Sequence, residues 1–319
     1  MVYEQKNPII EQILNNIDRV IIGKRNISEL SIVALLAEGH VLLEDVPGVG
    51  KTMMVRALAT SINASFKRIQ FTPDLLPSDV TGTSIYNPKE QEFNFRPGPI
   101  MGNIILADEI NRTSPKTQSA LLEGMEEASV TVDGVTRKLE QPFFVMATQN
   151  PIEHEGTYPL PEAQLDRFLL KMGMGYPQVV EEIDILNGVQ YNQPIEQLQP
   201  VIQVEEIRRL QEEVRNVHVD YAIKEYIVRI SNETRTDPSV YLGASPRGSI
   251  ALMKAGQAYA FIQGRDYVIP DDIQYLVPYV FSHRIILKPE ARYSGVTPEE
   301  IITKLLIRIP VPVQRTVKK

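Results

Sequence analysis

The sequence predicts an α/β domain, a parallel five-stranded sheet with helices on both faces, followed by an α-helical second domain. Three observations support this fold class. Five short apolar runs alternate with helical or irregular segments, as in a doubly wound sheet. A Gly-rich turn follows the first run, where such a sheet binds its ligand. Beyond about Gly175 the strand-like runs stop and helical patterns follow. We therefore expect two domains, at residues 1–185 and 186–319.

The five apolar runs have the length and composition of strands that are buried on both faces. They are His40 to Glu44, Phe66 to Phe71, Asn103 to Ala107, Phe143 to Thr148 and Phe168 to Met172. The carboxyl ends of parallel strands lie at one edge of a sheet, so functional side chains are expected just after these runs.

Two further segments predict β-hairpins inserted into the α/β unit. Between Pro73 and Pro99, polar and apolar residues alternate around an Asn87-Pro88 turn. A second alternating segment runs from Ser129 to Arg137, and its Asp133-Gly134 pair is a type I′ turn signal.

Helical signals dominate the second domain. Ser245-Pro246 is a helix cap followed by proline at the first helical position, and Thr297 to Glu300 repeats that arrangement as a capping box. Apolar residues at helical spacing form one stripe just before these caps: Val204, Ile207, Leu210, Val214 and Val217.

Composition narrows the class of protein. The chain has 319 residues, of which 43% are hydrophobic and 23% charged, as in an ordinary soluble protein. Its net charge of -7 disfavours a dedicated nucleic-acid binder, although a local basic stripe inside an assembled ring would escape this test. We expect no nucleic-acid partner.

The absence of cysteine excludes disulfides, thiol nucleophiles and zinc–thiolate sites. The four histidines, His40, His154, His218 and His283, lack the spacing of metal ligands. The N-terminal residues lack the pattern of a signal peptide, and no apolar run reaches the ~20 residues of a membrane span. We expect a cytoplasmic protein without a membrane segment.

The stretch from Val41 to Thr52 predicts a phosphate-binding loop. A strand ends at about Glu44, and Pro47 to Gly50 form a turn whose backbone N–H groups can face a phosphate at the start of the next helix. Lys51 would contact the β and γ phosphates, and the Thr52 hydroxyl would bind Mg²⁺. The strict pattern has glycine where this chain has Asp45. The alternative is a glycine turn without a ligand. The expected phosphate-binding residues are Gly48, Val49, Gly50, Lys51 and Thr52.

Two adjacent acids end the third apolar run. Burial of unpaired carboxylates is costly, so Asp108 and Glu109 need a cation, which a bound Mg-nucleotide offers. Asp108 would hold the Mg²⁺ shell through water, and Glu109 would polarise the water that attacks the γ-phosphorus. The alternative is a strand that simply leaves the sheet for solvent at Asp108.

The fourth apolar run ends at Asn150, before Pro151. In a parallel sheet this end lies at the same edge as Lys51 and Asp108. Asn150 could therefore orient the attacking water or contact the γ-phosphate. A turn-forming role for an asparagine before proline is the alternative, and both can hold.

These motifs, together with the segments from Leu160 to Phe168 and from Gly243 to Gly248, resemble the MoxR family of AAA+ ATPases over nearly the whole chain. The resemblance implies an AAA+ P-loop NTPase core and an α-helical lid, with ATP and Mg²⁺ as ligands. By this resemblance Lys51 and Thr52 belong to Walker A, Asp108 and Glu109 belong to Walker B, and Asn150 is sensor 1. Arg167 is the arginine finger and Arg247 is sensor 2. The hairpin between Tyr86 and Phe95 is the helix-2 insert, the Asp133-Gly134 hairpin is the pre-sensor 1 insert, and the adenine contact is at Ile21, Ile22 and Gly23.

Physical chemistry supports roles for the two arginines. A guanidinium that reaches the γ-phosphate from a neighbouring subunit can contribute about 10³ to 10⁵ in rate. For Arg167 the alternative is a surface ion pair with Asp166 or Glu162. Arg247 lies at a helix start, where a cation is unfavourable unless it faces an anion such as a phosphate; the alternative is a surface arginine without a partner.

The resemblance also implies a homo-oligomeric ring, usually a hexamer, and chaperone-like remodelling or maturation of a protein partner, often one with a von Willebrand factor A domain. Two other classes stay open. One is a nucleotide-gated binding scaffold with little turnover. The other is an ATPase subunit of a chelatase-like or DNA-associated machine, although neither hairpin is rich in Lys or Arg.

Overall fold

The computed structural model describes residues 6–46, 48–150, 157–191 and 194–312. They form two compact units. A core unit comprises Pro8–Gln211, and a helical unit comprises Met1–Asn7 with Glu212–Lys319. The core unit extends past residue 185, where the sequence analysis sets the boundary between its two predicted domains. Near the end of this unit the Gln211 amide donates to the Leu35 carbonyl at 2.7 Å, which ties the last helix of the unit to its beginning.

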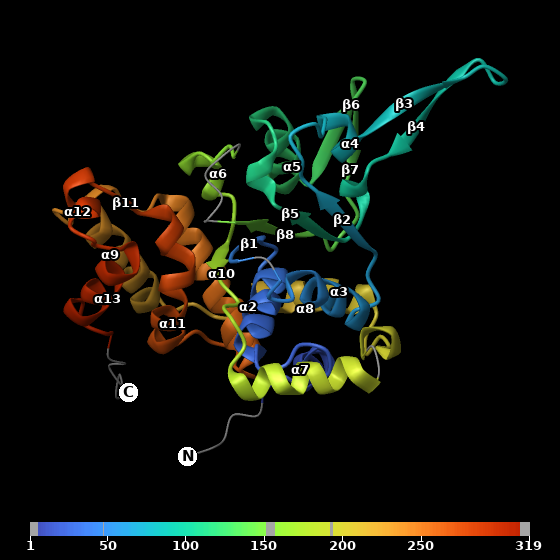
Figure 1. Cartoon of the computed structure of the whole chain (residues 1–319). Coiled ribbons are helices and arrows are strands. Elements are labelled where there is room, and N and C mark those ends of the chain that lie inside the picture. The colour runs from blue at the N-terminus through green and yellow to red at the C-terminus, as the bar shows by residue number, and fades with distance from the viewer. Residues whose placement is uncertain (1–5, 47, 151–156, 192–193, 313–319) are drawn as a thin grey trace. The chain divides into compact units, whose positions relative to one another are not determined.

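A parallel five-stranded sheet forms the centre of the core unit (Figure 1). Its strand order is β2-β5-β8-β1-β9, and all neighbouring pairs are parallel. This confirms the predicted sheet, with strand bounds close to those of the apolar runs. The strands are β1 (Val41–Glu44), β2 (Phe66–Gln70), β5 (Ile104–Asp108), β8 (Phe144–Gln149) and β9 (Leu170–Met172).

Helices cover both faces of this sheet, as predicted. In Figure 1, α5 (Pro115–Glu127) lies on one side of the strands, and α2 (Arg25–Leu36) and α3 (Lys51–Ser61) lie on the other. Under α5, buried residues that include Ile105 and Leu121 form a continuous apolar core. The other helices of the unit are α1 (Pro8–Asp18), α4 (Pro77–Thr81), α6 (Glu162–Leu165) and α7 (Val179–Tyr191). Its 3₁₀ turns are Pro99–Met101, Ile110–Arg112 and Pro194–Gln197. Helix α8 (Val204–Arg215) spans the division between the units.

Both predicted hairpins are present. The first consists of β3 (Gly82–Asn87) and β4 (Glu92–Pro97), and Figure 1 shows it projecting away from the sheet. The second consists of β6 (Ser129–Val132) and β7 (Val135–Lys138). Its turn residues Asp133 and Gly134 have φ angles of 52° and 75°, which is the left-handed pair that a type I′ turn requires.

The two hairpins contact each other. The Arg137 guanidinium of β7 lies 3.9 Å from the centre of the Phe95 ring of β4. Such a cation–π contact joins the hairpins at their bases. Further along the first hairpin, the exposed rings of Tyr86 and Phe93 pack against each other, with their ring centres 5.2 Å apart.

The second unit is mostly helical, as the sequence predicts. Ser245 and Thr297 cap their helices, with side-chain oxygens that accept from the N–H groups of Gly248 and Glu300. The helices of the unit are α9 (Tyr221–Thr236), α10 (Pro246–Ile262), α11 (Pro270–Phe281), α12 (Pro289–Tyr293), α13 (Pro298–Arg308) and the 3₁₀ turn Ser282–Arg284.

The helical unit also contains a small antiparallel pair that the sequence analysis did not predict. It consists of β10 (Val240–Leu242) and β11 (Ile286–Leu287). The strands are too short to produce an alternating pattern, which needs at least four residues. The expectation that strands end near Gly175 is therefore wrong for this pair. Among the described residues, no helix combines the length and apolarity that a bilayer crossing requires.

His40 is a buried neutral residue directly before β1. Its ring accepts at Nδ1 from the Val145 N–H at 3.1 Å and donates from Nε2 to the Met125 carbonyl at 3.1 Å. Burial lowers the pKa of His40 from 6.5 to about 4, although the bond to Met125 opposes the shift. Protonation at Nδ1 would remove an acceptor that a backbone N–H of β8 needs.

We expect the unfolding free energy to fall as the pH drops from 6.5 towards 4, because the unfolded state then binds a proton that folded His40 rejects. The full loss attributable to this residue is about 3 kcal/mol. Urea unfolding at several pH values, compared with His40→Gln, measures it. Equal pH slopes for the two proteins would contradict the assignment.

Candidate active site at the carboxyl edge of the sheet

The predicted phosphate loop connects β1 to α3. Gly48 and Gly50 have φ angles of 87° and 92°, which favour glycine. A side chain added at either position would meet none of the described atoms within 4 Å, so this side of the loop is open among the residues that the structure describes. No side chain caps the N-terminus of α3, which leaves its first N–H groups suited to an anion. The predicted turn also includes Pro47, which lies outside the described residues.

Lys51, the first residue of α3, points back across this loop. Its Nζ donates to the backbone carbonyl of Asp45 at 2.9 Å. Burial lowers the pKa of Lys51, and the carboxylates of Asp45, Asp108 and Glu109 oppose that shift. The lysine is therefore within electrostatic reach of Asp108, which ends β5, and of the adjacent Glu109, as the predicted site requires.

Asp45 occupies the position where the strict loop pattern has glycine, and the residue is only 9% exposed. Its carboxylate accepts from the N–H of Val46 at 2.9 Å and from the N–H of Gly175 at 2.7 Å. The acid thus ties the start of the phosphate loop to the chain that follows β9. A glycine at this position could make neither contact.

Asp108 is the last residue of β5 and lies opposite Gln70 in the β2 register. Both of its carboxylate oxygens are engaged. Oδ1 accepts from the Thr148 hydroxyl at 2.7 Å, and Oδ2 accepts from the Arg68 guanidinium at 2.5 Å. The strand end therefore does not simply leave for solvent, because its carboxylate meets partners from both neighbouring strands.

Glu109 follows in a left-handed backbone conformation, with φ 58° and ψ 48°. This conformation costs a non-glycine residue about 1 kcal/mol or more and is common at functional sites. The Glu109 N–H donates to the Thr148 hydroxyl at 2.8 Å. Its carboxylate accepts from the Gln70 amide at 2.8 Å and from the Arg112 guanidinium at 2.9 Å. These contacts hold the carboxylate at the edge of the sheet.

Asn150 directly follows β8 and is buried. Because β8 lies between β5 and β1, Asn150 lies at the edge of the sheet between the acid pair and the phosphate loop. Its carbonyl accepts from the Asn111 amide at 3.4 Å. Pro151, which the turn alternative needs, lies outside the described residues.

Arg167 follows the short helix α6, and its guanidinium pairs with Glu126 of α5 at 2.9 Å. The side chains are 27% and 32% exposed. The sequence alternative names Asp166 or Glu162 as the partner, whereas the structure shows a residue from a different helix. The pair leaves part of the arginine accessible from outside the core unit.

Arg247 lies in the helical unit, near the start of α10 directly after Pro246, and is exposed. This is the helix-start position that the sequence analysis describes. Its predicted contact with a phosphate would involve the other unit and stays a prediction.

Ile22 and Gly23 lie in the turn between α1 and α2. The Glu181 side chain is so close to Gly23 that an added Cβ would lie 2.0 Å from Oε1. Beside it, the Lys24 ammonium donates to the Tyr176 carbonyl at 3.0 Å. The segment 175–181 therefore contacts this turn as well as Asp45, so the predicted adenine contact and the phosphate loop share a neighbour.

Sequence reasoning missed the polar partners of the acid pair. Arg68 and Gln70 come from β2, Thr148 from β8 and Arg112 from the turn after Glu109. One available signal was that Gln70 also ends a strand at the carboxyl edge, where the same rule that selects Asp108 applies.

The donor chemistry at this edge fits Mg²⁺. Thr52, the second residue of α3, offers a hydroxyl oxygen, and Asp108 offers a carboxylate. Oxygen donors of this kind are the ligands that a small, hard cation prefers. Both come from elements that end or begin at the open side of the loop.

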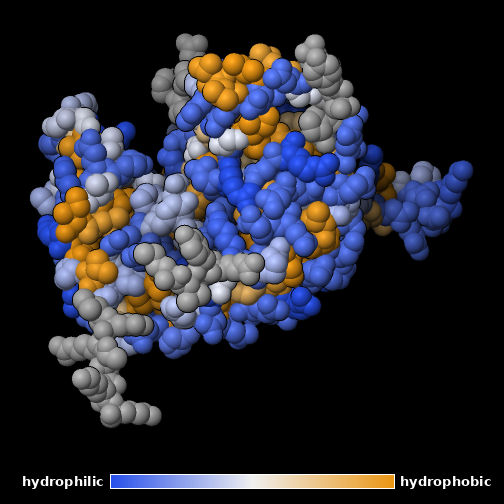
Figure 2. Space-filling view, turned by 90° about the horizontal axis from the view of Figure 1, so that it is seen from below, coloured by the Kyte–Doolittle hydropathy of each residue, from blue (hydrophilic) through white to orange (hydrophobic). Residues whose placement is uncertain are grey.

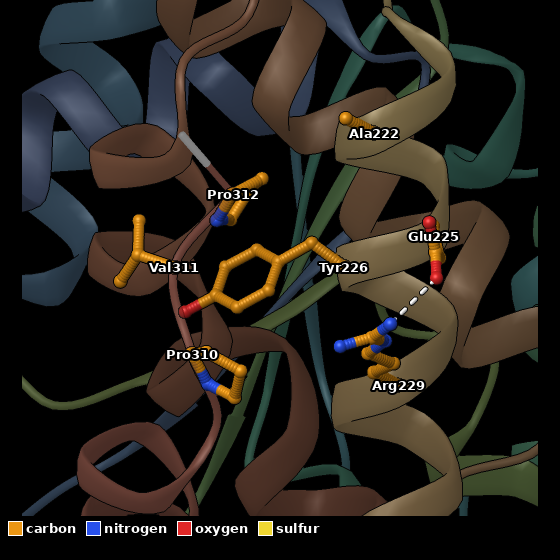
Figure 3. Close-up of a pocket in the computed structure, with 7 residues that line it drawn as sticks. All are labelled: Ala222, Glu225, Tyr226, Arg229, Pro310, Val311 and Pro312. Atoms are coloured by element: carbon orange, nitrogen blue, oxygen red, sulfur yellow. Dashed lines mark hydrogen bonds and ion pairs between the residues drawn. The ribbon is translucent and has the colours of Figure 1, made fainter. Parts of the chain in front are cut away.

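A separate cavity of about 180 Å³ lies in the helical unit, between α9 and the chain after α13 (Figure 3). The Tyr226 ring lies in the middle of the lining residues, and the Glu225–Arg229 ion pair, at 2.7 Å, lies to one side of it. None of the predicted site residues lines this cavity, whose walls are Ala222, Glu225, Tyr226, Arg229, Pro310, Val311 and Pro312.

The chain resembles known proteins over nearly its whole length. Residues 40–170 match the sequence pattern of a family described as "ATPase family associated with various cellular activities (AAA)", and residues 232–305 match an AAA lid domain. The chain is 66% identical to the YeaC protein of Bacillus subtilis, over 98% of both chains. It is 43% identical to Chaperone MoxR1 of Mycobacterium tuberculosis, covering 95% of this chain and 82% of the relative.

The chain belongs to the MoxR family of AAA+ ATPases. A crystal structure from Cytophaga hutchinsonii, described as that of a candidate ATPase, matches this MoxR-family chain with a TM-score of 0.90. It shares 38% identity and covers 96% of this chain and 95% of its own. The MoxR assignment confirms the resemblance, the fold class and the ATPase activity that the sequence predicts.

Proposed function

We propose that this MoxR-family ATPase hydrolyses Mg-ATP at the carboxyl edge of its sheet and uses the reaction to remodel or mature a partner protein. One observation carries the proposal: Lys51, the Asp108–Glu109 pair and Asn150 come from separate elements and meet at one edge. The name of the relative Chaperone MoxR1 supports the chaperone-like part.

In this proposal the loop binds the triphosphate. The N–H groups at the start of α3 face the phosphates, and Lys51 leaves the Asp45 carbonyl to contact the β and γ oxygens. The turn at Ile22 and Gly23 contacts the adenine. Thr52 and Asp108 would hold Mg²⁺, which supplies charge neutralisation of the β and γ phosphates when bound. The phosphate-binding residues are Gly48, Val49, Gly50, Lys51 and Thr52.

The reaction transfers the γ-phosphoryl group to water. Glu109 accepts a hydrogen bond from the attacking water and takes its proton, while Asn150 orients that water. The bond between the γ-phosphorus and the bridging oxygen breaks, and ADP leaves with phosphate. The contacts of Glu109 with Gln70 and Arg112 must loosen so that the carboxylate can reach the water.

The proposal includes a homo-oligomeric ring, with a hexamer as the expected form. Arg167 would reach the nucleotide of a neighbouring subunit, and Arg247 would report nucleotide state to the helical unit. Exposed apolar side chains on α7, which include Val179, Val180 and Leu186, support an association surface. Figure 1 shows α7 along the lower side of the core unit, and Figure 2 shows separate apolar patches on the surface seen from that direction.

A protein client, with a von Willebrand factor A domain as one candidate, is the partner that we expect. The cytoplasmic location and the absence of a nucleic-acid partner stay predictions of the sequence.

Affinity capture tests the remodelling function. A Glu109→Gln variant with ATP should retain a specific protein partner, because the nucleotide persists, whereas Lys51→Ala, which cannot bind ATP well, should not retain it. Identification of the retained proteins by mass spectrometry is the measurement. The same proteins on both variants would contradict the proposal. Normal release of the partner from wild-type protein with a non-hydrolysable ATP analogue would favour the scaffold alternative.

A further inference from the structure

Arg68 contacts the candidate metal-binding carboxylate directly. Its guanidinium donates to Asp108 Oδ2 at 2.5 Å and to the Gln70 side-chain oxygen at 2.7 Å. The second Asp108 oxygen is held by the Thr148 hydroxyl at 2.7 Å. An additional cation that approaches Asp108 therefore meets a carboxylate that already has a positively charged partner.

The two partners of Asp108 differ in their freedom to leave. The Arg68 side chain is 47% exposed, whereas that of Asp108 is 14% exposed. Thr148 is buried within the central strand β8. Arg68 lies on β2, at the edge of the sheet, where its long side chain can turn into solvent without disturbing the core. Displacement at Asp108 therefore affects Arg68 and leaves Thr148 in place.

Two cations that share one carboxylate repel each other and compete for its oxygens. We propose that Arg68 is a positioning residue that competes with Mg²⁺ for Asp108, so that the arginine sets the Mg²⁺ concentration at which the site binds metal and nucleotide together. This inference rests on the proposed function, since it assigns Asp108 to the metal. It adds a residue of β2 that no sequence motif singles out.

The size of the effect follows from the exposure of the ion pair. A half-exposed pair contributes a factor of about five at most. Removal of the Arg68 charge is therefore expected to lower the Mg²⁺ concentration for half-maximal nucleotide binding about threefold to fivefold. Replacement by lysine keeps the charge and should leave that concentration near the wild-type value.

A binding titration tests this competition. The full-length protein is mixed with a fluorescent ATP analogue and titrated with Mg²⁺, for wild type, Arg68→Gln and Arg68→Lys. Lys67→Gln is the matched control, because it removes one positive charge from the neighbouring exposed position, which faces the other side of β2. Binding of the analogue in excess EDTA measures any effect on the nucleotide alone, and thermal melting verifies that each variant is folded.

The expected result is a lower Mg²⁺ midpoint for Arg68→Gln, with wild-type midpoints for Arg68→Lys and Lys67→Gln. An unchanged or higher midpoint for Arg68→Gln, or an equal shift for Lys67→Gln, would overturn the inference. Wild-type protein that binds the analogue only weakly, or without dependence on Mg²⁺, would instead refute the proposed function, and this is visible before any variant is compared.

Discussion

Glu109→Gln is expected to lower ATP turnover about 10³-fold, because an amide cannot take the proton of the attacking water. Nucleotide binding should persist, since Glu109 follows β5, two strands away from β1, and does not belong to the phosphate loop. Steady-state phosphate release at saturating Mg-ATP measures turnover, and the fluorescent analogue measures binding. The left-handed backbone of Glu109 agrees with this role, because residues in strained backbone conformations are frequent at active sites.

A matched control tests whether the loss of any exposed carboxylate from this unit lowers turnover. Glu140→Gln removes an exposed carboxylate from the same unit and should leave turnover within about twofold of wild type, as is usual for a surface substitution. Equal turnover for wild type and Glu109→Gln would refute the assignment of Glu109 and the mechanism that depends on it.

Arg167→Ala is expected to lower turnover by about 10³-fold if its guanidinium stabilises the transition state in a neighbouring subunit. Each Arg167→Ala subunit keeps a complete loop and acid pair but supplies no arginine to the nucleotide site of its neighbour. A Lys51→Ala subunit has the opposite defect, since it binds nucleotide poorly but still offers Arg167. Mixing the two inactive proteins should therefore restore part of the turnover, because some interfaces then join an intact loop to an intact arginine.

Glu126→Gln is the control for the arginine. It breaks the ion pair with Arg167 but keeps the guanidinium, so a loss of only a few-fold is expected. If Glu126→Gln and Arg167→Ala have equal small effects, and the mixture with Lys51→Ala shows no more turnover than the two proteins assayed separately, Arg167 has only the structural role of an ion pair within its own subunit.

The sequence predicted the parts of the fold that depend on local pattern. Apolar runs located all five strands of the central sheet, and the rule for strand ends placed Asp108 and Asn150 at one edge. The Asp133-Gly134 turn and the Ser245 cap were also predictable, because each depends on a few neighbouring residues.

Contacts between distant segments were not predictable in the same way. The partner of Arg167 is Glu126, which the fold alone brings near, and Asp45 contacts Gly175 across an even larger separation in the sequence. Arg68 lies on a strand at the edge of the sheet, where an exposed basic residue is typical of a solvated surface and carries no signal of its own. The pair β10 and β11 was too short for any pattern.

A crystal structure of Glu109→Gln with ATP and Mg²⁺ tests the central claim most directly. We predict the triphosphate against the N-terminus of α3, with Lys51 Nζ moved from the Asp45 carbonyl to the β and γ oxygens, the metal between Thr52 and Asp108, and Asn150 facing the γ-phosphate. A nucleotide bound elsewhere, such as the cavity beside Tyr226, or a triphosphate without contact to Lys51, would contradict it.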